Sequence, residues 1–323
     1  MPSSLGVVTT RFSLVRDVDL VDKLISAGKI DVSAIKGKWE TWTTTLVSQP
    51  YPGVDKALVV VGSTKRGTIY GLYDLSEQIG VSPFYWFTDV PPKKQKEVYA
   101  LATTKTTKEP TVQYRGFFIN DEAPALTGWI NENYPRSNVT GRPGYTAQFY
   151  SHVFELLLRL KANYMWPTTW NSEFYVDDPQ NGPTADHYGI TMGTSHTEPM
   201  TRQSEEQESL LKGGWDWLDN QPAVKDFMKE GVVRTKEWDT LYTLGMRGLG
   251  DAASPTLNET VEEEIVKWQR ETLQTVLGKN ITDIAQLIVL FDVSPDCPDH
   301  CLDRCTLIEL GTRILLSVRN ASS

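Results

Sequence analysis

The sequence predicts an α/β protein whose second part is built on a parallel sheet. From Val112 to residue 287, short apolar strand patterns alternate with amphipathic helix patterns, and each strand runs into polar or aromatic residues. This order is typical of a (β/α) barrel or of an open parallel sheet. The chain has 323 residues, of which 40% are hydrophobic. That length corresponds to about two domains of roughly 100–200 residues each.

The first part of the chain, residues 1–108, is predicted to be a separate α/β segment. Residues 57–61 form a short buried strand pattern, and a helix is expected over about residues 68–78. Residues 88–111 are rich in Pro, Lys and Thr, a composition that indicates a solvated connection between domains.

The second part is predicted to alternate strands with longer helices. The expected strands are residues 114–119, 163–166, 190–193 and 241–246. One expected helix has Val153, Leu156, Leu157 and Leu160 on one face, a second covers residues 223–238, and a third has Val261, Ile265 and Trp268 on one face.

Polar and aromatic side chains gather where these four strands end. They are Asn120, Asp121 and Glu122, then Trp166 and Trp170, then His196 and Glu198, and finally Arg247 and Asp251. A single polar residue after a strand more often completes a turn or caps a helix. Four such clusters at the same edge of a sheet favour a functional site instead, because catalytic and ligand-binding residues are found at the carboxyl ends of parallel strands.

The residue types at these positions are typical of a site for an acidic sugar. Asp121 and Asp251 could flank a glycosidic bond, one protonating the leaving oxygen and the other activating water. Arg247 offers a planar fork to a substrate carboxylate. Trp166 and Trp170 would supply the apolar wall against which a sugar ring packs.

Composition excludes two classes of partner. The net charge of −9 argues against a nucleic-acid backbone, which requires clustered Lys and Arg. The longest apolar runs, residues 57–61 and 287–291, are far shorter than the roughly 20 residues of a membrane-spanning helix. The N-terminus also lacks the charged and apolar regions of a signal peptide.

Three short motifs suggest other chemistry, and each is incomplete. Residues 62–67 begin like a phosphate-binding loop, but Thr68 and Ile69 follow where that loop has Lys and Ser or Thr. Residues 193–197 resemble a nucleophile elbow without its closing glycine. His196–Glu198 matches the H-x-E part of a zinc deaminase without the following P-C-x-x-C.

The three cysteines lie together near the C-terminus, at positions 297, 301 and 305. With His300 they could form a local metal site, but spacing by four fits a helical face of small apolar residues better. We therefore expect neither a metal nor a cofactor.

Four longer stretches resemble glycoside hydrolase family 115, the xylan α-1,2-glucuronidases. They are residues 62–83, 114–126, 157–164 and 192–200, and the likeness runs from about residue 15 to about residue 287.

The resemblance implies an inverting enzyme that releases glucuronic or 4-O-methylglucuronic acid side chains from glucuronoxylan. It implies an N-terminal α/β domain over residues 1–108, the first half of a (β/α)8 barrel over residues 109–287, and a divergent tail over residues 288–323. Asn120 and Asp121 match the family's Asn-Asp pair. Arg247 and Asp251 match its Arg and acid, although Leu249 replaces the usual Asp between them.

The family's other site positions match with less agreement, and one is absent. Trp166 and His196 resemble active-site positions, and Glu122 and Trp170 are expected beside them to bind substrate. After Gln286 the family continues into a segment with a catalytic Glu, which would fall near Val293 here.

These departures predict a fragment truncated at both ends and inactive as written. The alternatives are a glucuronoxylan-binding remnant without catalysis, or a non-functional product of a shifted reading frame. The family is extracellular, although this chain carries no export signal of its own.

Overall fold

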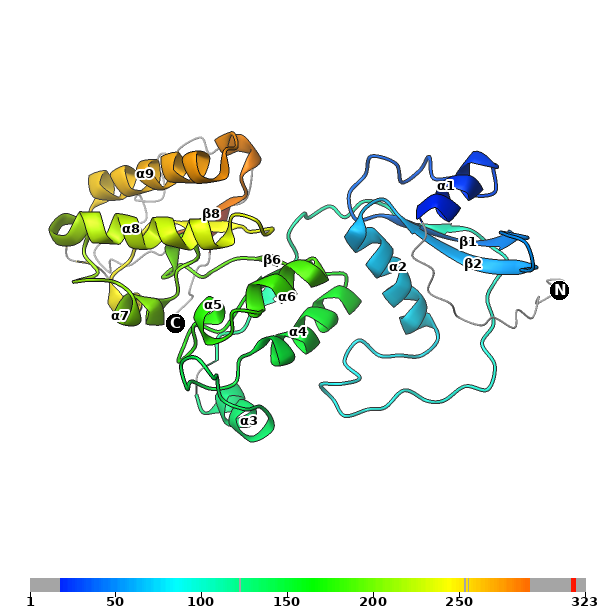
Figure 1. Cartoon of the computed structure of the whole chain (residues 1–323), viewed down its shortest axis with the longest axis horizontal. Helices are drawn as coiled ribbons and strands as arrows, with labels where there is room; N and C mark the ends of the chain where they lie inside the picture. The colour runs from blue at the N-terminus through cyan, green and yellow to red at the C-terminus, as the bar shows by residue number, and fades with distance from the viewer. Residues whose placement is uncertain (1–17, 122, 253, 255, 291–314, 318–323) are drawn as a thin grey trace. The chain divides into compact units, whose positions relative to one another are not determined.

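A computed structural model describes residues 18–121, 123–252, 254, 256–290 and 315–317 (Figure 1). The chain divides into two compact units. The first unit contains the described residues up to Arg115 together with residues 152–163. The second contains residues 116–151 and the described residues from Tyr164 onward. Each unit is described by itself.

Among its described residues, the first unit contains a small antiparallel sheet, helices α1 (Val18–Ser26) and α2 (Lys65–Gln78), and the last part of α4 (Ala147–Arg159). Strands β1 (Trp42–Ser48) and β2 (Lys56–Gly62) pair in the register Trp42 to Gly62. Strand β3 (Lys105–Thr106) pairs with the other edge of β1, which gives the order β2-β1-β3.

Helix α2 begins where the incomplete phosphate-loop motif lies. The hydroxyl of Thr64 accepts a hydrogen bond from the main-chain N–H of Gly67 at 3.1 Å, which caps the helix. Gly71 lies against the sheet, where a Cβ atom would come within 2.8 Å of the Trp42 ring. Residues 62–67 therefore form a strand-to-helix turn that docks α2 onto β1 and β2.

Residues 88–111 are mostly exposed, as expected of a solvated connection, but the last part of this stretch also contains a short strand. Residues 105 and 106 are β3, and the Thr107 hydroxyl accepts from the main-chain N–H of Trp42 at 2.9 Å. Threonine has a high strand propensity, and its hydroxyls add cross-strand hydrogen bonds here.

Glu40 is a buried carboxylate of the first unit, with 3% of its surface exposed. It accepts from Arg66 at 3.2 Å, from Arg115 at 2.5 Å and from the Asn163 amide at 2.7 Å. Two guanidinium groups and an amide thus compensate the desolvation of this charge. Glu40 therefore holds Arg115 and Asn163 together within the first unit.

The second unit is a series of parallel strands in sequence order. Strands β4 (Gly116–Phe118), β5 (Tyr164–Trp166) and β6 (Thr191–Met192) form one parallel sheet. Strands β7 (Tyr242–Leu244), β8 (Gln286–Leu290) and β9 (Leu315–Ser317) form another. A parallel bridge from Met192 to Thr240 links the two. The mixed α/β class predicted from the sequence is confirmed.

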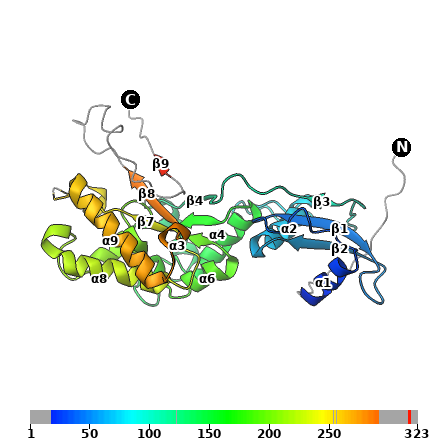
Figure 2. The same ribbon diagram turned by 90° about the horizontal axis from the view of Figure 1, so that it is seen from above.

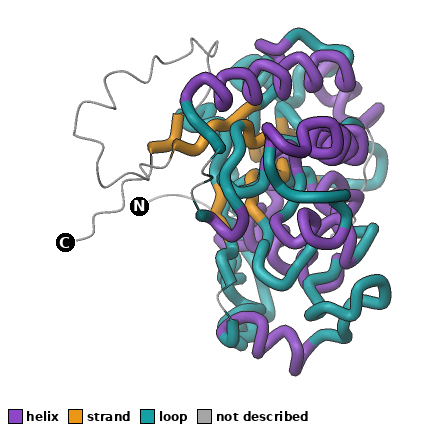
Figure 3. The backbone as a smooth tube through the Cα atoms, turned by 90° about the vertical axis from the view of Figure 1, so that its left-hand side faces the viewer, coloured by secondary structure: helices purple, strands orange, loops and turns teal. Residues whose placement is uncertain are grey.

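Helices separate these strands along the chain. Figure 3 distinguishes the helices, in purple, from the strands, in orange. The α-helices are α3 (Ala125–Asn133), α4 (Ala147–Arg159), α5 (Phe174–Asp177), α6 (Asn181–Tyr188), α7 (Ser204–Ser209), α8 (Trp217–Thr235) and α9 (Glu259–Leu277). The 3-10 turns are η1 (Pro199–Thr201), η2 (Leu249–Asp251) and η3 (Ile281–Asp283). Helix α4 runs from the second unit into the first.

Helices α8 and α9 lie side by side over β7 and β8 (Figures 1 and 2). Their apolar faces pack into a core cluster of the second unit, which includes Phe227, Met228, Ile265, Leu273 and Leu244. Helix α8 starts six residues before the predicted residue 223. Asp216 caps it through the N–H groups of Leu218 and Asp219, and its helical geometry breaks at Asn220, just before Pro222.

Candidate active site

The predicted site residues lie at one edge of the parallel sheet. Asn120 and Asp121 follow β4, Trp166 ends β5, His196 follows β6, and Arg247 follows β7. Parallel strands present their carboxyl ends at a common edge. Glu122 lies outside the described residues, as do the position of Val293 and the three cysteines with His300.

Asp121 is buried, with 3% of its surface exposed, and its carboxylate accepts four hydrogen bonds. Oδ1 accepts from the N–H of Leu126 at 2.8 Å, and Oδ2 accepts from the N–H of Thr127 at 2.9 Å. The hydroxyls of Thr127 and Tyr145 also donate to Oδ2. Burial, and then the bond to Asp121, raise the pKa of Tyr145 above its usual value. Asp121 therefore holds the start of α3 at the end of β4.

The aromatic side chains are held by polar contacts. The Trp170 indole is 43% exposed and donates to Oδ1 of Asn120 at 3.0 Å. The Trp166 indole N–H donates to the Tyr164 hydroxyl, and its ring lies edge-on to Phe118 with centroids 5.4 Å apart. These bonds fix two indoles at the predicted site.

Gly193 makes room for the Tyr164 ring. A Cβ atom at position 193 would overlap the phenolic oxygen and lie within 2.8 Å of two ring carbons. Because Gly193 has no side chain, the Tyr164 ring can lie beside the end of β6, where its hydroxyl accepts a hydrogen bond from the Trp166 indole.

His196 lies in a turn closed by Glu198. Oε2 of Glu198 accepts from the main-chain N–H and the hydroxyl of Ser195, both at 3.1 Å. Glu198 is fully buried, and this burial raises its pKa to about 8. The sequence pattern placed Glu198 in a strand-end cluster, but nothing in an H-x-E triplet reveals that its side chain is buried.

Arg247 follows β7 across a bend at Gly245, where φ is +98°. Its side chain is half-buried, and its carbonyl oxygen accepts from the Trp215 indole at 2.6 Å. Asp251 lies in η2, the 3-10 turn that follows Arg247. Glu262 of α9 lies beneath this loop, and burial raises its pKa to about 7. Sequence reasoning missed Glu262, because it occupies an ordinary helix position.

The structure brings some of these residues together and keeps others apart. Asn120 and Trp170 are in contact, as are Trp166 and Phe118. Strands β5 and β6 lie between β4 and β7, so Asp121 and Arg247 are separated by three strand spacings. At about 4.8 Å per spacing this is on the order of 14 Å.

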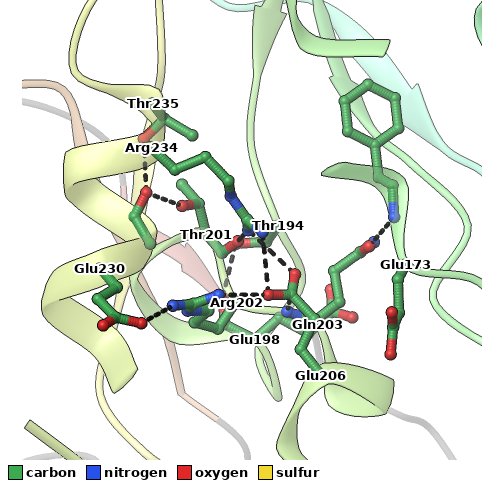
Figure 4. A network of polar contacts seen from close by, with 12 residues as sticks. Glu173, Thr194, Glu198, Thr201, Arg202, Gln203, Glu206, Glu230, Arg234 and Thr235 are labelled. Atoms are coloured by element: carbon green, nitrogen blue, oxygen red, sulfur yellow. Dashed lines mark hydrogen bonds and ion pairs between the residues drawn. The ribbon is translucent and has the colours of Figure 1, made fainter. Parts of the chain in front are cut away.

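A buried ion-pair cluster lies beside the Glu198 turn (Figure 4). Glu206 is fully buried and accepts from Arg202 at 2.6 Å and from both terminal nitrogens of Arg234 at 3.0 Å. Arg202 also pairs with Glu230 at 3.2 Å, and Glu230 is 77% exposed. The cluster joins the start of α7 to α8.

A shallow depression on α8 is lined by Asp226, Lys229, Glu230, Val233 and Arg234, and contains none of the predicted site residues. Within the described ranges, no three His, Cys, Asp or Glu side chains are grouped so as to hold a metal ion. Among the same residues, no helix has the length and apolarity that a membrane crossing requires.

Comparison with known proteins connects this arrangement to carbohydrate chemistry. Residues 107–299 match the model of glycosyl hydrolase family 115. The match continues past residue 287, where the resemblance was expected to end. None of the curated proteins matches the chain.

A solved structure is similar over most of the chain. It is described as a novel family GH115 4-O-methyl-α-glucuronidase, BtGH115A, with specificity for decorated arabinogalactans. The two share 34% sequence identity with a TM-score of 0.75. The similarity covers 83% of this chain and 35% of the other, so this chain spans about a third of that protein.

Proposed function

The chain belongs to glycoside hydrolase family 115, and we propose that it acts on glucuronic acid or 4-O-methylglucuronic acid side chains of a plant polysaccharide. The preferred substrate in this proposal is glucuronoxylan, and the reaction that the family implies is hydrolysis with inversion. We expect this chain itself not to hydrolyse, because valine stands near position 293, where the family has its catalytic Glu.

One observation carries the proposal. Carboxylate, amide, indole, imidazole and guanidinium groups follow successive parallel strands at the same edge of the sheet. An acidic sugar requires these groups together: a cation for the uronate, an apolar wall for the ring and carboxyl groups for proton transfer.

The proposal assigns a role to each predicted residue. Arg247 binds the uronic carboxylate, and Trp166 and Trp170 pack against the sugar ring. Asn120, Glu122 and His196 bind sugar hydroxyls. Asp121 and Asp251 are the candidate acid and base.

The environment of Asp121 sets a condition on its role. Its two carboxylate oxygens accept four hydrogen bonds, from Leu126, Thr127 and Tyr145. To transfer a proton, Asp121 would have to exchange the Tyr145 hydroxyl for a substrate oxygen. Without that exchange, it serves to hold the loop beside the sugar.

The proposal extends to the fold. The sequential parallel order of β4 to β8 supports the first half of a (β/α)8 barrel over residues 109–287, after an N-terminal α/β domain over residues 1–108. In this reading residues 288–323 are a divergent tail, although its first part, residues 288–299, lies within the family match. The family's usual location makes an extracellular setting part of the same proposal.

A second candidate function is binding without hydrolysis. It is favoured because the family's catalytic Glu would fall near Val293, and valine cannot take a proton. Arg247 and the indoles would remain able to bind a decorated chain.

Assays of purified residues 1–323 distinguish the two functions. The substrates are glucuronoxylan, decorated arabinogalactan and unsubstituted xylan, with BtGH115A as the positive control. We expect binding of a uronate-decorated chain and no release of 4-O-methylglucuronic acid. Release at a rate near that of the control would establish hydrolysis and identify another carboxyl group as base. Absence of both binding and release would refute both functions.

A further inference from the structure

The loop that carries Arg247 is held by polar side chains from outside the loop. The Gln269 side chain accepts from the N–H of Gly245 at 2.8 Å and donates to the carbonyl of the same residue at 2.9 Å. A carboxylate oxygen of Glu262 accepts from the N–H of Met246 at 2.9 Å. The Trp215 indole donates to the carbonyl of Arg247 at 2.6 Å.

Two of these side chains come from one face of α9. Gln269 and Glu262 are seven residues apart, which is two turns of a helix, so both face the end of β7. Gln269 is fully buried, and its amide satisfies both main-chain polar groups of Gly245. A buried amide with both donor and acceptor engaged is costly to replace, because the main-chain groups would be left without partners.

Gly245 lets the carboxylate approach. Its φ of +98° is accessible to glycine, and a Cβ atom there would lie 2.6 Å from Oε1 of Glu262. The bend at Gly245 therefore lets one face of α9 hold the main chain of residues 245 and 246, directly before Arg247.

We propose that Gln269 and Glu262 are positioning residues that fix the main chain before Arg247 and so aim its guanidinium group at the uronate. This inference rests on the proposed function, since it gives Arg247 a substrate carboxylate to bind. It adds that uronate selectivity depends on α9, a helix that need not touch the sugar.

The first test removes the contacts without a large change in volume. Gln269→Leu abolishes both bonds to Gly245, and Glu262→Leu abolishes the bond to Met246. Gln274→Leu is the matched control, since it makes the same exchange at an exposed position of α9. Leu273→Ala is a second control, which weakens α9 packing without touching the loop. Glu262→Gln keeps an oxygen acceptor and should restore the wild-type behaviour.

Two readouts are required on the purified full chain. Hydrogen exchange of the amides of residues 245 and 246 reports the state of the loop. Affinities for a xylooligosaccharide with and without a 4-O-methylglucuronic acid branch report selectivity. We expect faster exchange in both leucine variants at the loop, and a loss of about tenfold in affinity for the branched ligand alone.

The outcomes separate this inference from the proposed function. If the wild-type chain shows no preference for the branched ligand, the proposed function fails and this inference fails with it. If the preference exists and survives Gln269→Leu although exchange is faster, the inference is overturned while the proposed function stands. Equal losses in Leu273→Ala would also overturn it, because general loosening of α9 would then suffice. If Gln269→Leu does not fold, Glu262→Leu against Glu262→Gln decides.

Discussion

Tyr145 donates its phenolic hydrogen to Oδ2 of Asp121 at 2.6 Å, in a site where both residues are buried. The contact joins the loop before α4 to the end of β4. It explains why the most prominent acid in the sequence motif is also a structural residue. The same oxygen accepts from the hydroxyl and N–H of Thr127. Asp121 thus holds both the first turn of α3 and the segment before α4.

Asp121→Asn should lower the free energy of unfolding by about 2–3 kcal/mol, because an amide nitrogen would face donors at a buried site. Tyr145→Phe removes only the hydroxyl and should cost about 1 kcal/mol. Urea denaturation of the three proteins provides the measurement. Equal costs would mean that Asp121 is not the centre of these contacts.

Glu206→Gln should destabilise the chain by about 3–5 kcal/mol, because it leaves the buried Arg202 and the adjacent Arg234 without their charged partner. Glu230→Gln is the matched control, since Glu230 pairs with the same Arg202 from an exposed position. Its cost should stay below about 1 kcal/mol. Similar melting temperatures for the two variants would contradict this account of the cluster.

Stability should fall as the pH rises from about 4.5 to about 8, and Glu198 should account for part of the fall. Burial raises the folded-state pKa of Glu198 to about 8, against 4.5 for an ordinary glutamate. Between these values the folded chain binds the proton more firmly than the unfolded chain, so raising the pH favours unfolding. One pKa unit corresponds to about 1.4 kcal/mol, so the effect is on the order of a few kcal/mol.

Glu198→Gln should flatten this pH dependence, and urea midpoints between pH 5 and pH 8 measure it. The control is Glu208→Gln, at an exposed position of α7. A wild-type slope that persists in Glu198→Gln would show that other groups carry it.

Arg247→Lys should weaken binding of uronate-decorated xylooligosaccharide by about tenfold or more, while the melting temperature changes little. A lysine ammonium cannot reproduce the two parallel hydrogen bonds of a guanidinium fork. Calorimetric titration gives the affinity, and Arg136→Lys at an exposed position controls for the loss of a guanidinium. Unchanged affinity would remove Arg247 from the proposed site.

The sequence predicted the parallel half of the fold well, because its strands are buried and apolar and end in polar clusters. Strands β4 to β7 lie within the predicted ranges. It failed for β3, whose two residues lie in a stretch rich in Pro and Lys and gain strand geometry only by pairing with β1. Leu160 was placed on the apolar face of α4 but is 43% exposed, because the helix ends at Arg159.

The candidate site was predictable in position and less so in chemistry. Counting strands identified the edge that bears Asn120 and Arg247. It could not reveal that Asp121 accepts four hydrogen bonds. The donors lie on Leu126, Thr127 and Tyr145, and they reach Asp121 only through the fold of the loop after β4 and of the segment before α4. Burial of Glu198 and Glu262 depends on tertiary packing, which no local spacing encodes.

Gly193 has a consequence for how the chain can be altered. Its missing side chain admits the Tyr164 ring, and the Tyr164 hydroxyl accepts from the Trp166 indole. A larger residue at position 193 would displace the tyrosine and release the indole, whereas a smaller residue at 164 would leave room at 193 but no acceptor for Trp166. Positions 164, 166 and 193 are therefore coupled, and a variant that changes the Trp166 surface requires compatible residues at all three.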